Sequence, residues 1–211
     1  MISAAVQLAP VDTPARARDG GIIALGLLTL YVALAQGTFY KVDGQALIEL
    51  STNGWVHHPY HHFYLGELWL LRGACEPLGL GIYRTACLLS ALGTAAGVLL
   101  IHCATRVVGL GRAACNLAAL AFGLSPGVMF FASIVEVHGP FLPFAGVAAL
   151  AIAWCGKTLH WRAAVVAGLS LTLAYLAHPS GALMGALLPS LAWSAANGAR
   201  PGPQPLRWRA L

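Results

Sequence analysis

Five long stretches of this 211-residue chain contain no Asp, Glu, Lys or Arg, and they limit the possible fold more than any other feature. A helix needs about 20 apolar residues to cross the hydrocarbon core of a bilayer. The longest stretch, 163–199, would reach roughly 55 Å as one helix, well beyond the thickness of that core. It contains AHPSG, where Pro179 disfavours helical backbone at His178, so we expect two short spans joined by a tight turn. The stretches are 20–40, 85–105, 113–135, 137–156 and 163–199.

The composition excludes an ordinary soluble domain. Only 9% of the residues are charged and 58% are hydrophobic, whereas a soluble domain carries about 25% charged residues. The net charge is +5, but no basic run is present, so we expect no nucleic-acid partner. The five cysteines form neither a CxxC pair nor a zinc spacing, and we interpret them as small buried apolar residues. They are Cys75, Cys87, Cys103, Cys115 and Cys155.

These features predict an all-α fold class, a polytopic membrane helix bundle of about six spans. The membrane module covers residues 20–196, between a cytoplasmic N-terminal tail (1–19) and a cytoplasmic C-terminal tail (197–211). An outer loop follows the first span, at 41–84. The spans are expected near 20–40, 85–105, 113–132, 138–156, 159–177 and 180–196.

The outer loop differs from the spans because it carries several charges and four histidines. Each charge would cost about 2.5–3.5 kcal/mol at the bilayer centre, so the loop does not cross. Apolar residues still recur at helical spacing around Leu47 and around Leu65 and Leu68. We expect two amphipathic helices that lie in the membrane interface. Glu67 falls on an otherwise apolar face and is interpreted as a solvated acid.

The charges predict an orientation in the plasma (inner) membrane. With the N-terminus in the cytoplasm, nine basic residues lie on the cytoplasmic side and three, Lys41, Arg72 and Arg84, lie outside. Five of the seven acids, and all histidines except His102 and His160, then lie outside. Ionisable groups at the edge of a helix bundle are candidates for function. Membrane lipids are the first partners that this arrangement implies.

The order of motifs resembles that of the glycosyltransferase-C superfamily, in particular bacterial protein O-mannosyltransferase-like proteins. Their first outer loop carries an Asp-x-x-Glu-like element and a His-Pro-Pro-Gly-Tyr-Pro segment, which here read DGQALIEL and HHPYHHFY. SIVEVHGPFLPF resembles their Ala-Val-x-x-Glu-Val-Tyr turn, and GLSLTLAYLAHPSGALMGALLP resembles their Gly-Leu-x-x-Gly-x-x-His segment. The similarity covers roughly residues 20–196. Superfamily members are usually longer, so the chain is expected to be an N-terminal module.

The resemblance implies an activity and a site. The activity is transfer of a sugar from a polyprenyl-phosphate donor to an acceptor at the extracytoplasmic face. The resemblance assigns the catalytic base to Asp43 and maps substrate contacts onto the later motifs. The implied substrate-binding residues are Glu136, His138, His178, His58, Tyr60 and Arg84.

The residues themselves leave alternatives open at each of these positions. Asp43 could instead cap a helix beginning at Gly44. Glu136 and His138 could bind a sugar hydroxyl or a divalent metal, or could be a helix-start acid beside a solvated histidine. His178 could donate to a phosphate or satisfy a broken helix. Arg84 could pair with a lipid phosphate or serve as an interfacial anchor.

The four loop histidines allow a separate interpretation. His57 and His61, and likewise His58 and His62, would share a helix face at i, i+4 spacing, which suits a metal such as zinc. Pro59 argues against an unbroken helix there. Contacts to substrate or headgroups, and simple interfacial positions, are the other interpretations. His57, His61 and His62 are the candidate metal ligands.

Three functions therefore remain open at this level. The first is a membrane glycosyltransferase. The second is a non-catalytic membrane subunit or truncated remnant of such an enzyme, including one half of a split enzyme that a second chain completes. The third is a His-rich metal-binding membrane protein. A transporter is disfavoured because its ionisable residues should lie near mid-membrane, where these spans are almost free of charge.

Overall fold

The computed structural model of the chain describes residues 13–37 and 42–190. Helices and short connections make up these ranges, and no strand occurs in them, so the all-α class is confirmed. The expected tails lie largely outside the described residues, as do Lys41 and the end of the last expected span, 191–196. The helices are α1 (Thr13–Ala33), α2 (Val42–Thr52), α3 (Tyr64–Cys75), η1 (Glu76–Leu78), α4 (Ile82–Val108), α5 (Arg112–Gly123), α6 (Pro126–Ala132), α7 (His138–Thr158), α8 (Trp161–Ala177) and η2 (Pro179–Leu187).

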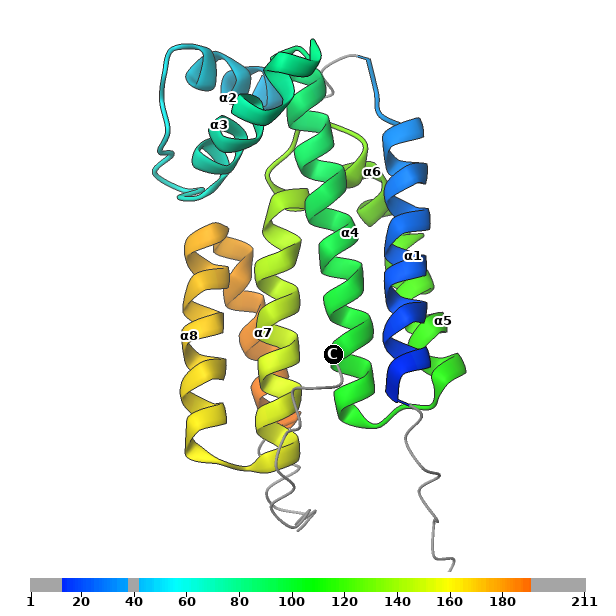
Figure 1. Ribbon diagram of the computed structural model, residues 1–211. Coiled ribbons are helices and arrows are strands. Elements are labelled where there is room, and N and C mark those ends of the chain that lie inside the picture. Colours follow the sequence, from blue (N-terminus) through cyan, green and yellow to red (C-terminus); the bar gives the residue numbers. More distant parts are fainter. Residues whose placement is uncertain (1–12, 38–41, 191–211) are drawn as a thin grey trace, which may run out of the picture.

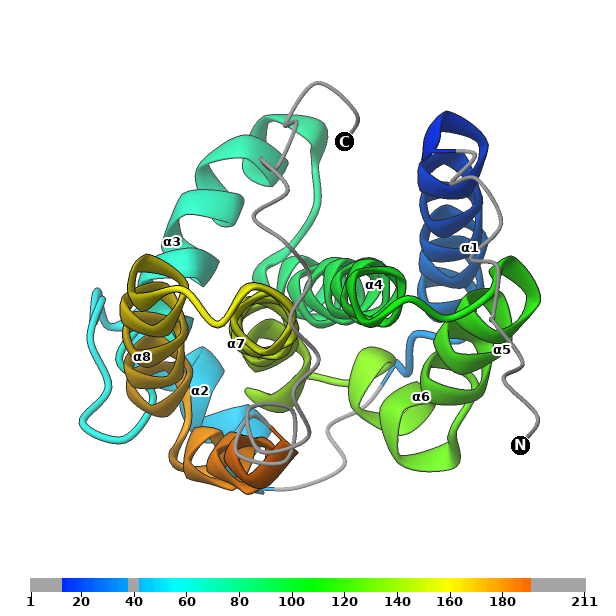
Figure 2. The same cartoon turned by 90° about the horizontal axis from the view of Figure 1, so that it is seen from below.

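Helices α4 and α7 form the centre of the bundle and lie side by side in both views (Figures 1 and 2). Glycines make this approach possible, because a Cβ at Gly93 would lie 2.5 Å from the carbonyl oxygen of Gly139. Helix α8 packs on the other side of α7, and α1 packs on α4. The long helix α4 ends where Gly109 adopts φ 100°, a left-handed conformation that glycine tolerates.

The helix expected over 113–132 is instead two helices, α5 and α6, whose axes differ by 62°. The break falls at Ser125 and Pro126. Proline has no N–H to donate to the preceding turn and opens a new helix readily, which explains a new start at that residue.

The last expected span also differs from its prediction. Its first part is the 3₁₀ helix η2, which returns against α8 from the break at His178. Gly181 permits this close return, because a Cβ there would lie 2.3 Å from the backbone of Ala174. The break predicted at AHPSG is therefore present, whereas a regular α-helix directly after it is not.

Two helices, α2 and α3, occupy the loop between α1 and α4, at the end of the bundle where α7 begins and α8 ends (Figure 1). Their apolar residues Leu47, Leu65 and Leu68 pack with Ala86 of α4 and with Val135 and Val137. A small hydrophobic core thus fixes this cap on the bundle.

Within the described residues, α4 and α7 are long and apolar enough to cross a membrane. The bent pair α5–α6 would be a third span if it crosses as one unit, and α8 is apolar but has only 17 residues. Two or three helices of this kind are typical of a membrane protein.

The two ends of the bundle carry different charges. Basic residues lie where α4 and α7 end and where α5 and α8 begin, whereas Glu67 and Glu136 lie at the opposite end. At the basic end, Arg112 donates to both carboxylate oxygens of Asp19, at 2.8 Å for the Nη2 bond. Asn116 links the same carboxylate to the buried His102. This network joins α1, α4 and α5.

Candidate functional site

Three chain breaks meet at the acidic end of the bundle. They are the junction between α6 and α7 at 133–137, the break between α8 and η2 at His178, and the connection between α2 and α3 at 53–63. Each break has a local cause. His178 is extended (φ −159°, ψ 138°), as expected for a residue before proline, and Pro140 lies in the first turn of α7, where no N–H is needed.

The histidines from these breaks form a continuous series of ring contacts, two of them stacked and one tilted. His61 stacks on His178 with ring centroids 4.9 Å apart, and the ring of His138 lies 4.6 Å from that of His178. His58 stacks on His61 at 4.9 Å. We call His58, His61, His138 and His178 the histidine cluster. It joins residues that are 120 positions apart in the sequence.

The pairing inside the loop differs from the helical spacing that the sequence suggested. The chain turns at Pro59 and Tyr60, so His57 stacks on His62 at 5.0 Å and His58 stacks on His61. The i, i+4 pairs would require a helix, and this segment is not helical. Among the described residues, no group of three or more His, Cys, Asp or Glu side chains is arranged to hold a metal ion.

Glu136 lies beside the cluster as a buried carboxylate, 7% exposed. Its Oε1 atom accepts a hydrogen bond from the backbone N–H of Val137 at 2.8 Å and lies 3.3 Å from Nδ1 of His138. Ser90 of α4 donates to the backbone carbonyl of Glu136 at 3.1 Å. The loop that carries the carboxylate is therefore anchored to the central helix.

Burial favours the neutral form of three histidines of the cluster, His58, His61 and His178. Desolvation lowers the pKa of His61 to about 4, and the neighbouring His178 and His58 add to the effect. Desolvation also lowers the pKa of His178, with a further contribution from His138, and it lowers the pKa of His58. The charge of Glu136 acts in the opposite direction on His61 and His178. Neutral imidazoles can each offer one donor and one acceptor to a ligand.

A narrow crevice lies next to the cluster, between α3, α7 and the end of α8. Glu67 enters it, and burial raises the pKa of this carboxyl to about 7. The Oη atom of Tyr64 is buried and has no hydrogen-bond partner among the described residues. The lining residues are Phe63, Tyr64, Glu67, Val137, Pro140, Phe141, Phe144 and Ala177.

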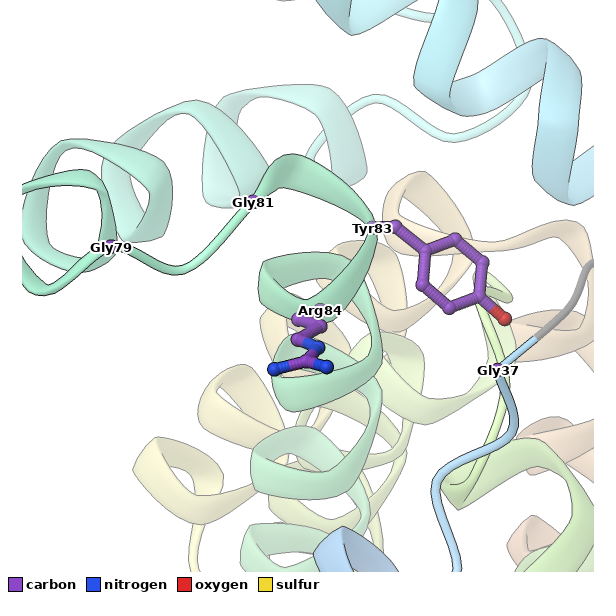
Figure 3. A pocket seen from close by; sticks show the side chains of 5 residues that line it. All are labelled: Gly37, Gly79, Gly81, Tyr83 and Arg84. Carbon is purple, nitrogen blue, oxygen red and sulfur yellow. The ribbon is translucent and has the colours of Figure 1, made fainter.

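The remaining predicted site residues are exposed and lie at the same end of the bundle. Asp43 is in the first turn of α2, which begins at Val42, so it is not the cap of a helix that begins at Gly44. Tyr60 is 68% exposed at the turn of the loop. Arg84 lines an open cleft of about 490 Å³ at the start of α4 (Figure 3). Figure 3 shows the Arg84 side chain over the first turns of α4, whereas the ring of Tyr83 points away from it toward Gly37. Gly79 and Gly81 complete the lining of the cleft.

The structure thus brings together Glu136, His138, His178 and His58, and it adds His61 as the link between loop and bundle. Asp43 lies in the first turn of α2 and Arg84 in the first turn of α4, outside the histidine cluster. Glu67 was expected to be a solvated acid, but packing of α3 against α7 half-buries it in the crevice, and Tyr64 is a further polar group that the sequence analysis did not select. The sequence feature that could have identified both residues is the presence of an acid and a phenol on the apolar face of one helix.

Comparisons with known proteins identify no relative: no protein-family model, curated protein or solved structure matches this chain.

Proposed function

We propose that this chain is a membrane glycosyltransferase, or the N-terminal part of one, that transfers a sugar from a polyprenyl-phosphate donor at the extracytoplasmic face. The observation that carries the proposal is the meeting of Glu136 with the histidine cluster at one end of an apolar bundle. Such a site offers a proton acceptor and hydrogen-bond donors at the depth of lipid headgroups.

The proposal includes a bundle of about six spans with both termini in the cytoplasm, with α2 and α3 in the outer interface. The opposite charges at the two ends support this orientation, because basic loops stay in the cytoplasm. The donor's phosphate needs positive charge or donors as it leaves. Arg84 in its open cleft and the imidazoles of the cluster are the groups available for this task.

The reaction also needs a base that takes the proton of the attacking hydroxyl, and the resemblance assigns this role to Asp43. Its position in the first turn of α2 leaves it exposed to a ligand from outside. We give no separate weight to the metal-binding alternative, because the histidines pair as stacked rings with no common coordination centre within the described residues.

The test uses the purified chain in proteoliposomes with undecaprenyl-phosphate carrying radiolabelled mannose or glucose. Release of sugar to water or to added acceptor is measured, so the natural acceptor need not be known. Asp43→Asn should lower release, because the variant lacks a carboxylate that the transfer requires. Glu76→Gln is the matched control, since Glu76 is an exposed acid on the same cap and pairs with Arg72.

A wild-type chain that releases no sugar from either donor, alone or with a co-expressed neighbouring subunit, would contradict the proposal. The non-catalytic subunit would then be the better interpretation. Unchanged release by Asp43→Asn would remove that residue from the reaction.

A further inference from the structure

The surroundings of His178 and His138, whose ring centroids lie 4.6 Å apart, favour opposite tautomers. Nδ1 of His178 accepts a hydrogen bond from the backbone N–H of Ser180 at 3.0 Å. A ring nitrogen that accepts carries no proton, so the neutral imidazole of His178 holds its proton on Nε2. His178 therefore presents a donor to any ligand that reaches its free edge.

His138 is held in the other tautomer. Its Nδ1 atom is buried and lies 3.3 Å from Oε1 of Glu136, and it makes no hydrogen bond with another group in the described residues. A lone pair on Nδ1 would be repelled by the carboxylate that it faces, whereas an N–H at this position is attracted to the carboxylate. The separation is longer than an ordinary hydrogen bond, as is common for catalytic pairs without substrate. The proton therefore lies on Nδ1, and the lone pair lies on Nε2.

Packing orients both rings. The ring of Phe131 stacks on His138 with centroids 4.4 Å apart, and His61 covers His178. The side chain of His138 is still 35% exposed, so a ligand can reach it. The acceptor of one ring and the donor of the other therefore lie within one small region, with centroids 4.6 Å apart.

We propose that His138, oriented by Glu136, accepts the proton of the attacking hydroxyl, and that His178 donates a hydrogen bond to the phosphate of the donor. This inference rests on the proposed function and deepens it, because it names the groups that contact each substrate. Asp43 then acts through contacts to the sugar, and His138 replaces it as the base.

The proposed step balances. The acceptor oxygen forms a bond to the anomeric carbon while the bond from that carbon to the phosphate oxygen breaks. The phosphate oxygen keeps the electron pair, and the polyprenyl phosphate leaves as a dianion. The hydroxyl proton moves to Nε2 of His138, and the resulting imidazolium is stabilised by the adjacent carboxylate of Glu136.

The tautomers can be measured without turnover. The chain is labelled with ¹⁵N-histidine in detergent micelles or nanodiscs, and long-range proton–nitrogen spectra distinguish protonated from unprotonated ring nitrogens. The variants His138→Gln and His178→Gln assign the signals. We expect an unprotonated Nε2 for His138 and an unprotonated Nδ1 for His178. Glu136→Gln should shift His138 toward the other tautomer, whereas Glu76→Gln should leave it unchanged.

Undecaprenyl phosphate without sugar is the binding probe in the same samples. Its addition should shift the Nε2–H signal of His178 more than any signal of His138. In the proteoliposome assay, His138→Gln should lower sugar release by about 10²–10⁴-fold.

A His138 ring protonated on Nε2 in the wild type would overturn the inference, and so would a phosphate response confined to His138. The wild-type spectrum decides this even if Glu136→Gln fails to fold. If the tautomers and the phosphate response are as expected but no sugar is released, the proposed function fails and the phosphate contact stands.

Discussion

Glu67 shows how one side chain can change its chemistry through packing. The structure places it half-buried against aromatic side chains of α3 and α7, with its carboxyl pKa raised to about 7 from 4.5. The folded chain therefore holds a proton on Glu67 between about pH 4.5 and 7, whereas the unfolded chain does not. A pKa raised in the folded state means that stability falls as pH rises through this window.

Replacing Glu67 with Gln should therefore stabilise the protein only at high pH. At pH 8 the wild type must bury a carboxylate, and the variant does not. Allowing for the water that reaches this side chain, we expect a gain of about 1–2 kcal/mol, or roughly 2–6 °C in the unfolding temperature. Thermal unfolding in detergent at pH 8 and pH 4.5 measures it, with Glu76→Gln as an exposed control. An equal effect at both pH values would contradict the burial of Glu67.

The sequence identified single site residues better than their partners. Charge sorting alone placed Glu136, His138 and His178 on one side of the membrane, and the structure brings their side chains together. It could not reveal that His61 stacks on His178, because that contact depends on how the loop folds back onto α8. The helical spacing of the loop histidines predicted the wrong ring pairs, although Pro59 already argued against a helix.

The elements show a similar division between what a pattern can predict and what packing decides. The small residues Gly93 and Gly97 line the contact with α7, where added Cβ atoms would lie 2.5 Å from Gly139 and 2.7 Å from Leu142. Gly181 is also in close contact, but Gly185 has open space around it. Gly93 and Gly97 are four residues apart in the sequence, as are Gly181 and Gly185, and this shared spacing does not say which helix face meets a neighbour.

A substitution in the α4–α7 contact should move the site as well as weaken the bundle. A Cβ at Gly93 would meet backbone atoms of Gly139 and Pro140, next to His138, and backbone cannot rotate away. We expect Gly93→Ala to cost about 1–3 kcal/mol and to lower sugar release. Gly168→Ala on α8 is the matched control, because nothing lies within 4 Å of its added Cβ. Thermal unfolding compares the two variants.

A more stable Gly93→Ala protein would show that the two helices are not packed as closely as described. Equal losses in Gly93→Ala and Gly168→Ala would point to a general effect of glycine replacement. The fold and the site are linked here, because the same helix contact sets the start of α7.

At the scale of the whole molecule, hydropathy predicted the helical class but overestimated the regularity of the helices. The length of an uncharged stretch cannot distinguish one straight span from the bent pair α5–α6, because a straight helix of the same sequence would be equally apolar. The proline at 126 carried that information, as did Pro179 for the break before η2. The distribution of charges better predicted which sequence-distant residues lie at the same end of the bundle, because charged residues resist crossing the bilayer.

That sorting predicts which connections face the cell exterior. After replacement of the five free cysteines, single cysteines are introduced at Thr52 on the cap and at Leu110 between α4 and α5, both exposed positions. A membrane-impermeant maleimide should label position 52 on intact cells, and position 110 only after permeabilisation. The reason is that moving Arg106 and Arg112 outward costs about 2.5–3.5 kcal/mol each at the bilayer centre. Labelling of position 110 alone on intact cells would place the histidine cluster away from extracytoplasmic donors and would remove the basis of the proposed transfer. Labelling of both positions on intact cells would contradict the predicted placement of the two connections on opposite sides of the membrane.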